Sequence, residues 1–244
     1  MFSGKIEDYI LFEDKEIIVC RKPAGIAVQN ARIGAMDLES SLKNYLAMQD
    51  GGGRRIPYLA VIHRLDQPVE GILVFGKTPE AAKSLSAQIT AGKMEKIYLA
   101  VTYGKQAEAG KKEKVLEDYL KKDGKSNTSS VVNANTPGAK KARLSYEVLG
   151  EAVDAISGKK KWLLRIHLDT GRHHQIRVQF ASRGLGLYGD TKYNPKFQKT
   201  KKKYTEIGLY STRISFNHPV TGERMTFKIE PSREAFEKMD VEAF

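Results

Sequence analysis

Cysteine is almost absent from this chain, since Cys20 is the only one among 244 residues. A single cysteine excludes an intramolecular disulfide and a structural zinc site built from several cysteines. The five histidines do not compensate, because His173 and His174 are adjacent and the others are scattered without metal-ligand spacing. We therefore expect no metal site.

Long apolar runs are also missing. No stretch approaches the length of a membrane span, and Lys5, Glu7 and Asp8 interrupt the amino terminus before a signal sequence could develop. No amphipathic basic helix or lipidation signal stands out either. We expect a cytoplasmic protein that does not bind a membrane.

Positive charge, by contrast, is abundant. The chain has 41 Lys and Arg residues against 29 Asp and Glu residues, a formal charge of +12. A surplus of this size favours a polyanionic partner, and nucleic acid fits better than an acidic membrane. A generally solubilising surface is the alternative interpretation.

Apolar patterning predicts an α+β fold with more strands than helices. Strands are expected where apolar residues form short runs or alternate, at residues 9–12, 17–20, 72–75, 96–102, 144–148, 162–168 and 225–229. Helices are expected at residues 38–48, 79–90 and within 170–184. Antiparallel pairing is favoured, because one side of several strands is polar.

The segment at about 106–141 is rich in Lys, Ser, Asn and Gly. Its apolar content is too low for an independent core, so we interpret it as an excursion from the main sheet. The whole of 1–244 is then predicted to be a single domain. Two other basic loops suit contact with phosphate, namely Gly51–Arg55 and the lysine-rich 196–203 with its aromatic neighbours.

The stretch His63–Gly71, reading HRLDQPVEG, is the strongest candidate site. Pro68 disfavours the helical region for Gln67, so the segment is expected to be an extended turn that presents the Asp66 carboxylate. The apolar run Ile72–Phe75 follows and predicts a buried strand that would hold the turn rigidly. An aspartate in such a turn is often only a solvated turn former, and the remaining motifs decide between the two interpretations.

Six short blocks together resemble the RluA-type pseudouridine synthases along most of the chain. In order they are KPAG at 22–25, HRLD with its following glycine at 63–71, KIYLAV at 96–101, TGRHHQIRV at 170–178, GDTKY at 189–193 and HPVTGE at 218–223. The resemblance implies a mixed, largely antiparallel sheet with flanking helices and loops around an RNA-binding cleft. It also implies a cofactor-independent isomerase that acts on ribosomal or transfer RNA, and we expect a monomer.

The resemblance assigns roles to individual residues. The catalytic aspartate of the family falls on Asp66, the tyrosine that packs on the target base falls on Tyr98, and the basic partner of the aspartate falls on Arg177. Without the resemblance, Tyr98 would simply cover the second face of a sheet. RNA contacts are expected from Arg64, Lys96, Arg172, His174 and Gln175, with the alternative that His174 and Gln175 orient their loop.

The chemistry explains these residue types. Uridine becomes pseudouridine when the bond from N1 to the ribose breaks, the base turns, and C5 is joined to the ribose instead. A carboxylate can attack the sugar or the uracil ring, or abstract a ribose proton, and the sequence does not choose among these routes. Burial disfavours an ionised carboxylate and a guanidinium favours it, so Arg177 beside Asp66 would keep the acid charged in a closed pocket.

Some positions depart from the family. Residues 67–70 read QPVE where relatives carry a charged residue followed by Thr-Ser, and Glu70 near anionic RNA would disfavour a phosphate contact there. His173 and Gln179 also differ from the residues usual in the family. His63 is expected to have a structural role in shaping the turn. No S4-type RNA-binding module is expected. A non-catalytic RNA-binding protein on the same scaffold is the second hypothesis. A glycosidic hydrolase is the third, although no second carboxylate for acid catalysis is evident.

Overall fold

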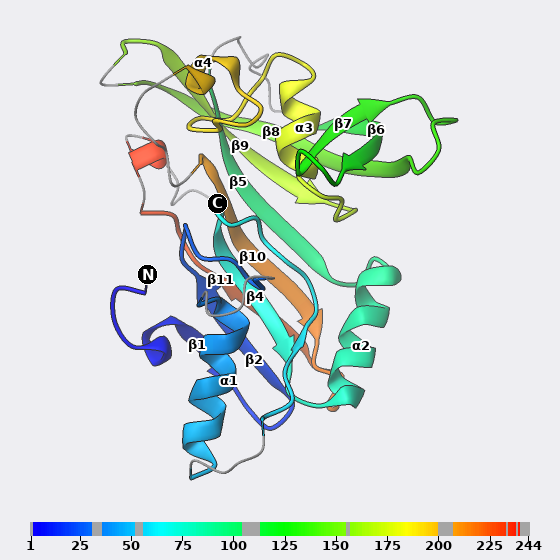
Figure 1. Ribbon diagram of the computed structural model, residues 1–244. Helices are drawn as coiled ribbons and strands as arrows, with labels where there is room; N and C mark the ends of the chain where they lie inside the picture. The colour runs from blue at the N-terminus through cyan, green and yellow to red at the C-terminus, as the bar shows by residue number, and fades with distance from the viewer. Residues whose placement is uncertain are drawn as a thin grey trace. The chain divides into compact units, whose positions relative to one another are not determined.

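A computed structural model of the protein describes residues 2–30, 36–51, 56–103, 113–154, 157–199, 207–232, 234–237 and 239. The chain forms two compact units (Figure 1). Unit 1 consists of Met1–Glu95 and Arg213–Ile229, and unit 2 of Lys96–Thr212 and Glu230–Phe244. Both are built on antiparallel strands with few helices, which confirms the predicted α+β class with its largely antiparallel sheet. That the chain acts as one catalytic domain stays a prediction.

Unit 1 is organised around four strands in the order β1-β2-β4-β10, and β10 contributes its part from Arg213 onward. Their bounds, with those of the short flanking elements, are η1 (Ile6–Tyr9), β1 (Ile10–Glu13), β2 (Ile17–Lys22), β3 (Ala60–Val61), β4 (Glu70–Gly76), β10 (Leu209–Asn217) and β11 (Arg224–Lys228). β3 pairs with β4, and β11 with β10. The predicted amino-terminal hairpin is confirmed as β1 and β2, and the predicted buried strand as β4, all of whose residues are buried.

Two helices complete unit 1, α1 (Leu38–Gln49) and α2 (Pro79–Thr90). Both begin at the residue expected, and each has a side-chain cap: the Asp37 side chain accepts from the N–H of Ser40, and the Thr78 side chain accepts from the N–H of Ala81. α2 packs on β4, where Leu85 joins the apolar side chains of β2, β4 and β10 in one core. The two buried residues of α2 are Ala81 and Leu85, whereas its apolar pattern predicts that Ala82 faces inward with Leu85.

Unit 2 contains five strands in the order β5-β9-β8-β6-β7. They are β5 (Glu95–Tyr103), β6 (Lys114–Asp123), β7 (Thr128–Val132), β8 (Lys140–Val153) and β9 (Lys160–Leu168). The predicted excursion contains the β6–β7 hairpin, which extends the sheet through pairing of β6 with β8. Alternation along β5 does not separate a buried face from an exposed one, because both Tyr98 and Leu99 are buried.

The helices of unit 2 are short: α3 (Gln175–Ala181), α4 (Pro195–Gln198) and η2 (Glu234–Phe236). α3 lies beside β6 and β7 (Figure 1), and its Val178 packs with Leu120 and Ala142. Gly184 follows it with a φ of 73°, which confirms the predicted termination by glycine.

Strand β10 was not predicted. Its sequence LYSTRISFN lacks a polar face, yet Ser211, Thr212 and Ser215 are buried beside its apolar residues. A strand buried on both faces gives no alternation to detect. In the part of the chain that the structure describes, the helices are too short or too polar to cross a membrane.

Candidate active site

Asp66 lies in the irregular segment between β3 and β4, as expected. The turn at Gln67 and Pro68 is closed by a hydrogen bond of 3.0 Å from the N–H of Val69 to the carbonyl of Asp66. Val69 and Leu65 are buried on either side of the half-exposed aspartate. The strand that follows is fully buried, so the carboxylate is presented from a rigidly anchored turn.

The turn that carries Asp66 is attached to the KPAG turn. Gly25 N–H donates to the Gln67 carbonyl at 2.8 Å, and the Gln67 side chain donates back to the Gly25 carbonyl at 3.0 Å. Gly25 has a φ of 85°, a left-handed conformation that glycine adopts without steric cost. The KPAG block and the Asp66 turn thus form one local structure, although Lys22 and Gln67 are 45 residues apart in the sequence.

Lys22, the first residue of the KPAG block, is fully buried. Its ammonium donates to the carbonyls of Pro23 at 2.9 Å, Ile26 at 2.7 Å and Gln67 at 3.1 Å. Burial lowers the pKa of Lys22 to about 7, against the opposing effect of the Asp66 and Glu70 carboxylates. The sequence analysis did not single out this lysine, although the KPAG block contained it.

Glu70 does not face solvent beside Asp66, as its charge had suggested. It is the first residue of β4, is only 6% exposed, and lies 4.0 Å from the guanidinium of Arg21. Its charge therefore acts within the unit, on Arg21 and Lys22. Its effect on a phosphate contact at this position stays a prediction.

Two residues shortly before Asp66, His63 and Arg64, lie in different environments. His63 is partly buried, and its Nε2 accepts a 3.4 Å hydrogen bond from the N–H of Val74 in β4. This contact agrees with the structural role expected for the histidine. Arg64 is exposed, as a side chain that contacts RNA must be.

Tyr98 and Lys96 lie on β5, in unit 2. Tyr98 is 5% exposed and is paired with Ile166 of β9. Lys96 is 6% exposed, and burial lowers its pKa while Asp169 opposes the shift. Because a buried charge needs a paired partner, Lys96 is better suited to one anionic group than to the solvent-exposed RNA backbone.

Arg177 has a partner that sequence analysis missed. Its Nε and Nη2 donate to the two carboxylate oxygens of Asp190 at 2.9 and 2.8 Å, and both side chains are buried. Asp190 also accepts from the N–H groups of Lys192 and Tyr193, so the GDTKY block fixes the guanidinium. The signal was present, because an aspartate followed by a turn was already among the matching blocks. Pairing of Arg177 with Asp66 stays a prediction.

The loop before α3 is held on β8 by Gln175 and Thr170. Gln175 is 3% exposed, donates to the Arg143 carbonyl at 3.1 Å, and accepts from Thr170 and from the N–H of Arg172. The expectation that Gln175 orients the loop is therefore supported, and its burial disfavours the alternative of RNA contact. Gln179 continues this network by donating to Asp118 at 2.7 Å.

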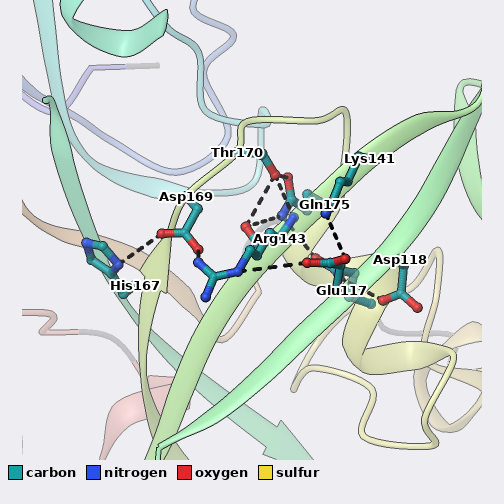
Figure 2. Close-up of polar contacts among 9 residues, drawn as sticks. Glu117, Asp118, Lys141, Arg143, His167, Asp169, Thr170 and Gln175 are labelled. Atoms are coloured by element: carbon teal, nitrogen blue, oxygen red, sulfur yellow. Dashed lines mark hydrogen bonds and ion pairs between the residues drawn. The ribbon is translucent and has the colours of Figure 1, made fainter. Parts of the chain in front are cut away.

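A row of polar and charged side chains connects β6, β8 and β9 with the start of the same loop. Figure 2 shows ion pairs that run from His167 through Asp169 and Arg143 to Glu117 and Lys141. These residues are partly exposed, so each pair stabilises little by itself. Arg172 is exposed, and its Nε donates a hydrogen bond of 2.8 Å to the Lys141 carbonyl. This contact with β8 fixes the position of the Arg172 side chain.

The adjacent histidines connect the loop to the β6–β7 hairpin. The Nδ1 of His173 lies 2.8 Å from Ser129 Oγ, and its Nε2 lies 3.1 Å from Asn127 Oδ1. The ring of His174 stacks on that of His173, and its Nδ1 lies 2.7 Å from the Tyr193 hydroxyl. His173, which departs from the family pattern, thus fastens the hairpin to the loop.

Some candidates cannot be placed. Arg54, Arg55 and Lys201–Lys203 lie outside the described residues. Among the described residues, no three His, Cys, Asp or Glu side chains gather in a group that could hold a metal ion.

A family model described as RNA pseudouridylate synthase matches residues 16–182. Ribosomal large subunit pseudouridine synthase D of Pseudomonas aeruginosa is 30% identical over 91% of this chain and 68% of its own length. Synthase C of Pasteurella multocida is 31% identical over 91% of this chain and 64% of its own. The chain thus spans about two thirds of the length of these relatives.

Solved structures agree on the fold. Human RNA Pseudouridylate Synthase Domain Containing 4 matches with a TM-score of 0.71 at 20% identity, over 95% of this chain and 92% of that one. The family match, which covers more than half of the chain and includes the Asp66 turn, confirms the assignment that the six blocks predicted. The chain belongs to the RNA pseudouridylate synthase family.

Proposed function

We propose that this protein is a cofactor-independent RNA pseudouridine synthase that isomerises specific uridines in ribosomal or transfer RNA. The observation that carries the proposal is the Asp66 turn, held by hydrogen bonds to the KPAG turn and followed by a fully buried strand. Rigid support for one carboxylate is what a reaction with a single acidic group requires.

Asp66 is the catalytic residue in this proposal. Its carboxylate assists cleavage of the bond between N1 and C1′, the detached uracil turns, and C5 forms the new bond to C1′. N1 ends with a proton, and the hydrogen at C5 leaves as a proton, so the product is an isomer of the substrate. Tyr98 provides a flat wall for the base, which must leave its stack to be reached.

Arg177 supplies positive charge to the Asp66 carboxylate. Its bidentate contact with Asp190 uses two of the five N–H groups of a guanidinium. Asp190 therefore orients the group, and a contact with Asp66 would employ another of its N–H groups. The fixed, buried fork is suited to a carboxylate partner.

RNA is bound by basic side chains near these motifs. Arg64 and Arg172 are exposed and are suited to the RNA backbone or to a splayed base, and Lys96 and His174 lie deeper. The printed names of the curated relatives concern the large ribosomal subunit, so ribosomal RNA is the first substrate to test. We propose a monomer, found in the cytoplasm.

Release of tritium from RNA labelled at uridine C5 tests this function. The wild-type protein is expected to release label from total RNA of its own source, and Asp66→Ala is expected to release none. Asp50→Ala, which removes an exposed carboxylate at the end of α1, serves as the control and should retain release. Full release by Asp66→Ala would overturn the catalytic assignment, and no release by the wild type from any RNA would overturn the proposed function.

A further inference from the structure

Lys22, at the end of β2, is a buried cation that contacts the Asp66 turn and that the proposed mechanism leaves without a role. Its three N–H donors meet three carbonyl oxygens, those of Pro23, Ile26 and Gln67, at 2.9, 2.7 and 3.1 Å. An ammonium has three N–H groups, whereas a neutral amine has two. The geometry is therefore that of the charged form, and loss of the proton would leave one of these carbonyls facing a lone pair.

The carbonyl of Gln67 makes this charge relevant to the site. Gln67 follows Asp66 directly, and its carbonyl also accepts from the N–H of Gly25. The ammonium thus fixes the backbone immediately after the catalytic aspartate. It belongs to the same unit as Asp66 and lies close enough for the two charges to interact.

Two further groups determine whether Lys22 stays protonated. The Glu70 carboxylate is 6% exposed and acts on Lys22 from the start of β4, where Lys22 is paired with Gly71. Cys20, two residues before on β2, is buried, and burial raises the pKa of its thiol, so it remains neutral. Arg21 also faces Glu70, at 4.0 Å, from the more exposed side.

We propose that Lys22 is a positioning residue for Asp66, and that Glu70 keeps Lys22 charged so that the ammonium can hold the turn. This inference rests on the proposed role of Asp66. It gives a function to Glu70, since a buried carboxylate compensates for the burial of the lysine.

The charge balance supports the proposal. Burial lowers the pKa of Lys22 to about 7 against the opposing effect of both carboxylates, so the lysine is poised to lose its proton near neutrality. Removing one of the two carboxylates must lower that pKa further. The protonated fraction at pH 7 to 8 would then fall, and with it the fraction of molecules in which the turn is held.

The first test needs no catalytic activity. Lysine side chains labelled with 13C and 15N are titrated by NMR in the intact protein, and the Lys22 signal is assigned by its loss in Lys22→Met. Glu70→Gln is expected to move the Lys22 midpoint to lower pH by about half a unit or more, equivalent to a roughly threefold change in proton affinity. Glu13→Gln is the matched control, because Glu13 is a partly buried carboxylate of the same unit paired with Lys77.

The second test is the pH profile of kcat/KM for tritium release. Glu70→Gln should shift the loss of activity at high pH in the same direction as the Lys22 midpoint, so that its defect is larger at pH 8 than at pH 6. An unmoved Lys22 midpoint, or an unmoved rate profile despite a moved midpoint, overturns the inference. Circular dichroism shows whether the Lys22→Met protein folds. If it does not fold, the rate profile of Glu70→Gln is the deciding test. Failure of the proposed function is distinct, because the wild type would then release no label at any pH.

Discussion

Gln67 and Gly25 are joined by two reciprocal hydrogen bonds, one from the Gly25 N–H to the Gln67 carbonyl and one from the Gln67 side chain to the Gly25 carbonyl. They connect the residue that follows the proposed catalytic aspartate with the end of the KPAG block. The contact explains why these two motifs occur together in one chain, since each turn lacks regular secondary structure and depends on the other for its conformation.

Replacing Gln67 with alanine should loosen the Asp66 turn without unfolding the protein. The substitution removes one hydrogen bond of an exposed side chain, so the free energy of unfolding should fall by no more than about 1 kcal/mol. We expect a severalfold loss in kcat that exceeds any change in KM, because the carboxylate would be less well oriented. Urea unfolding and steady-state tritium release measure the two effects.

Gln29→Ala is the matched control for this experiment. Gln29 is also an exposed glutamine of unit 1 whose side chain donates one hydrogen bond, to Glu39 at 2.7 Å. It should cost similar stability and leave kcat unchanged. Equal losses of kcat in both variants would show that the reciprocal contact with Gly25 has no special role.

The buried pair of Arg177 and Asp190 makes a different prediction. Asp190→Asn leaves a guanidinium in the interior without its bidentate partner, so the free energy of unfolding should fall by about 3 kcal/mol. Urea unfolding measures this loss. Glu151→Gln breaks the exposed pair of Glu151 with Lys160 in the same unit and should change the same quantity by less than about 1 kcal/mol. A small effect of Asp190→Asn would contradict the view that Asp190 fixes Arg177.

Much of the fold was predictable because local chemistry and packing agree. α1 and α2 begin at residues with strong capping preferences, and β4 is an apolar run whose burial needs no further information. β10 was missed for the opposite reason. Its serines and threonine are buried beside apolar residues, and only the neighbouring strands, which are distant in sequence, determine that burial.

The candidate site shows the same division. The motif blocks identified Asp66, Tyr98 and Arg177, and those assignments remain predictions. Partners such as Lys22 for the Gln67 carbonyl, or Asp190 for Arg177, could not be derived from spacing. A buried lysine is recognised only when the three carbonyls around it are known, since lysine in a sequence suggests an exposed side chain.

Acid should weaken unit 1 through Asp14. Burial of Asp14 disfavours its charge, but the N–H groups of Ile17 and Glu16, each at 2.8 Å, and His218 outweigh this effect and hold the pKa of Asp14 below its ordinary value of 3.8. A lowered pKa in the folded state contributes stability that is complete above 3.8 and is lost as the pH falls through the folded-state value. The difference in unfolding free energy between wild type and Asp14→Asn should therefore shrink below about pH 4. Urea unfolding from pH 7 to 3 measures this difference, and a difference that stays constant over the whole range would contradict the prediction.

RNA affinity should depend on Arg64 mainly through charge. Arg64 is exposed beside the Asp66 turn, and a phosphate contact contributes affinity that falls as salt displaces it. Arg64→Ala should weaken binding of total ribosomal RNA and reduce the slope of log Kd against log salt by about one, with no change in melting temperature. Arg224→Ala is the control, because Arg224 is another exposed arginine of unit 1, on β11.

Filter binding between 50 and 200 mM salt, a range over which phosphate contacts lose much of their affinity, separates the two variants. An unchanged slope for Arg64→Ala would mean that its guanidinium does not contact phosphate, and the residue would then be tested for stacking on a flipped base.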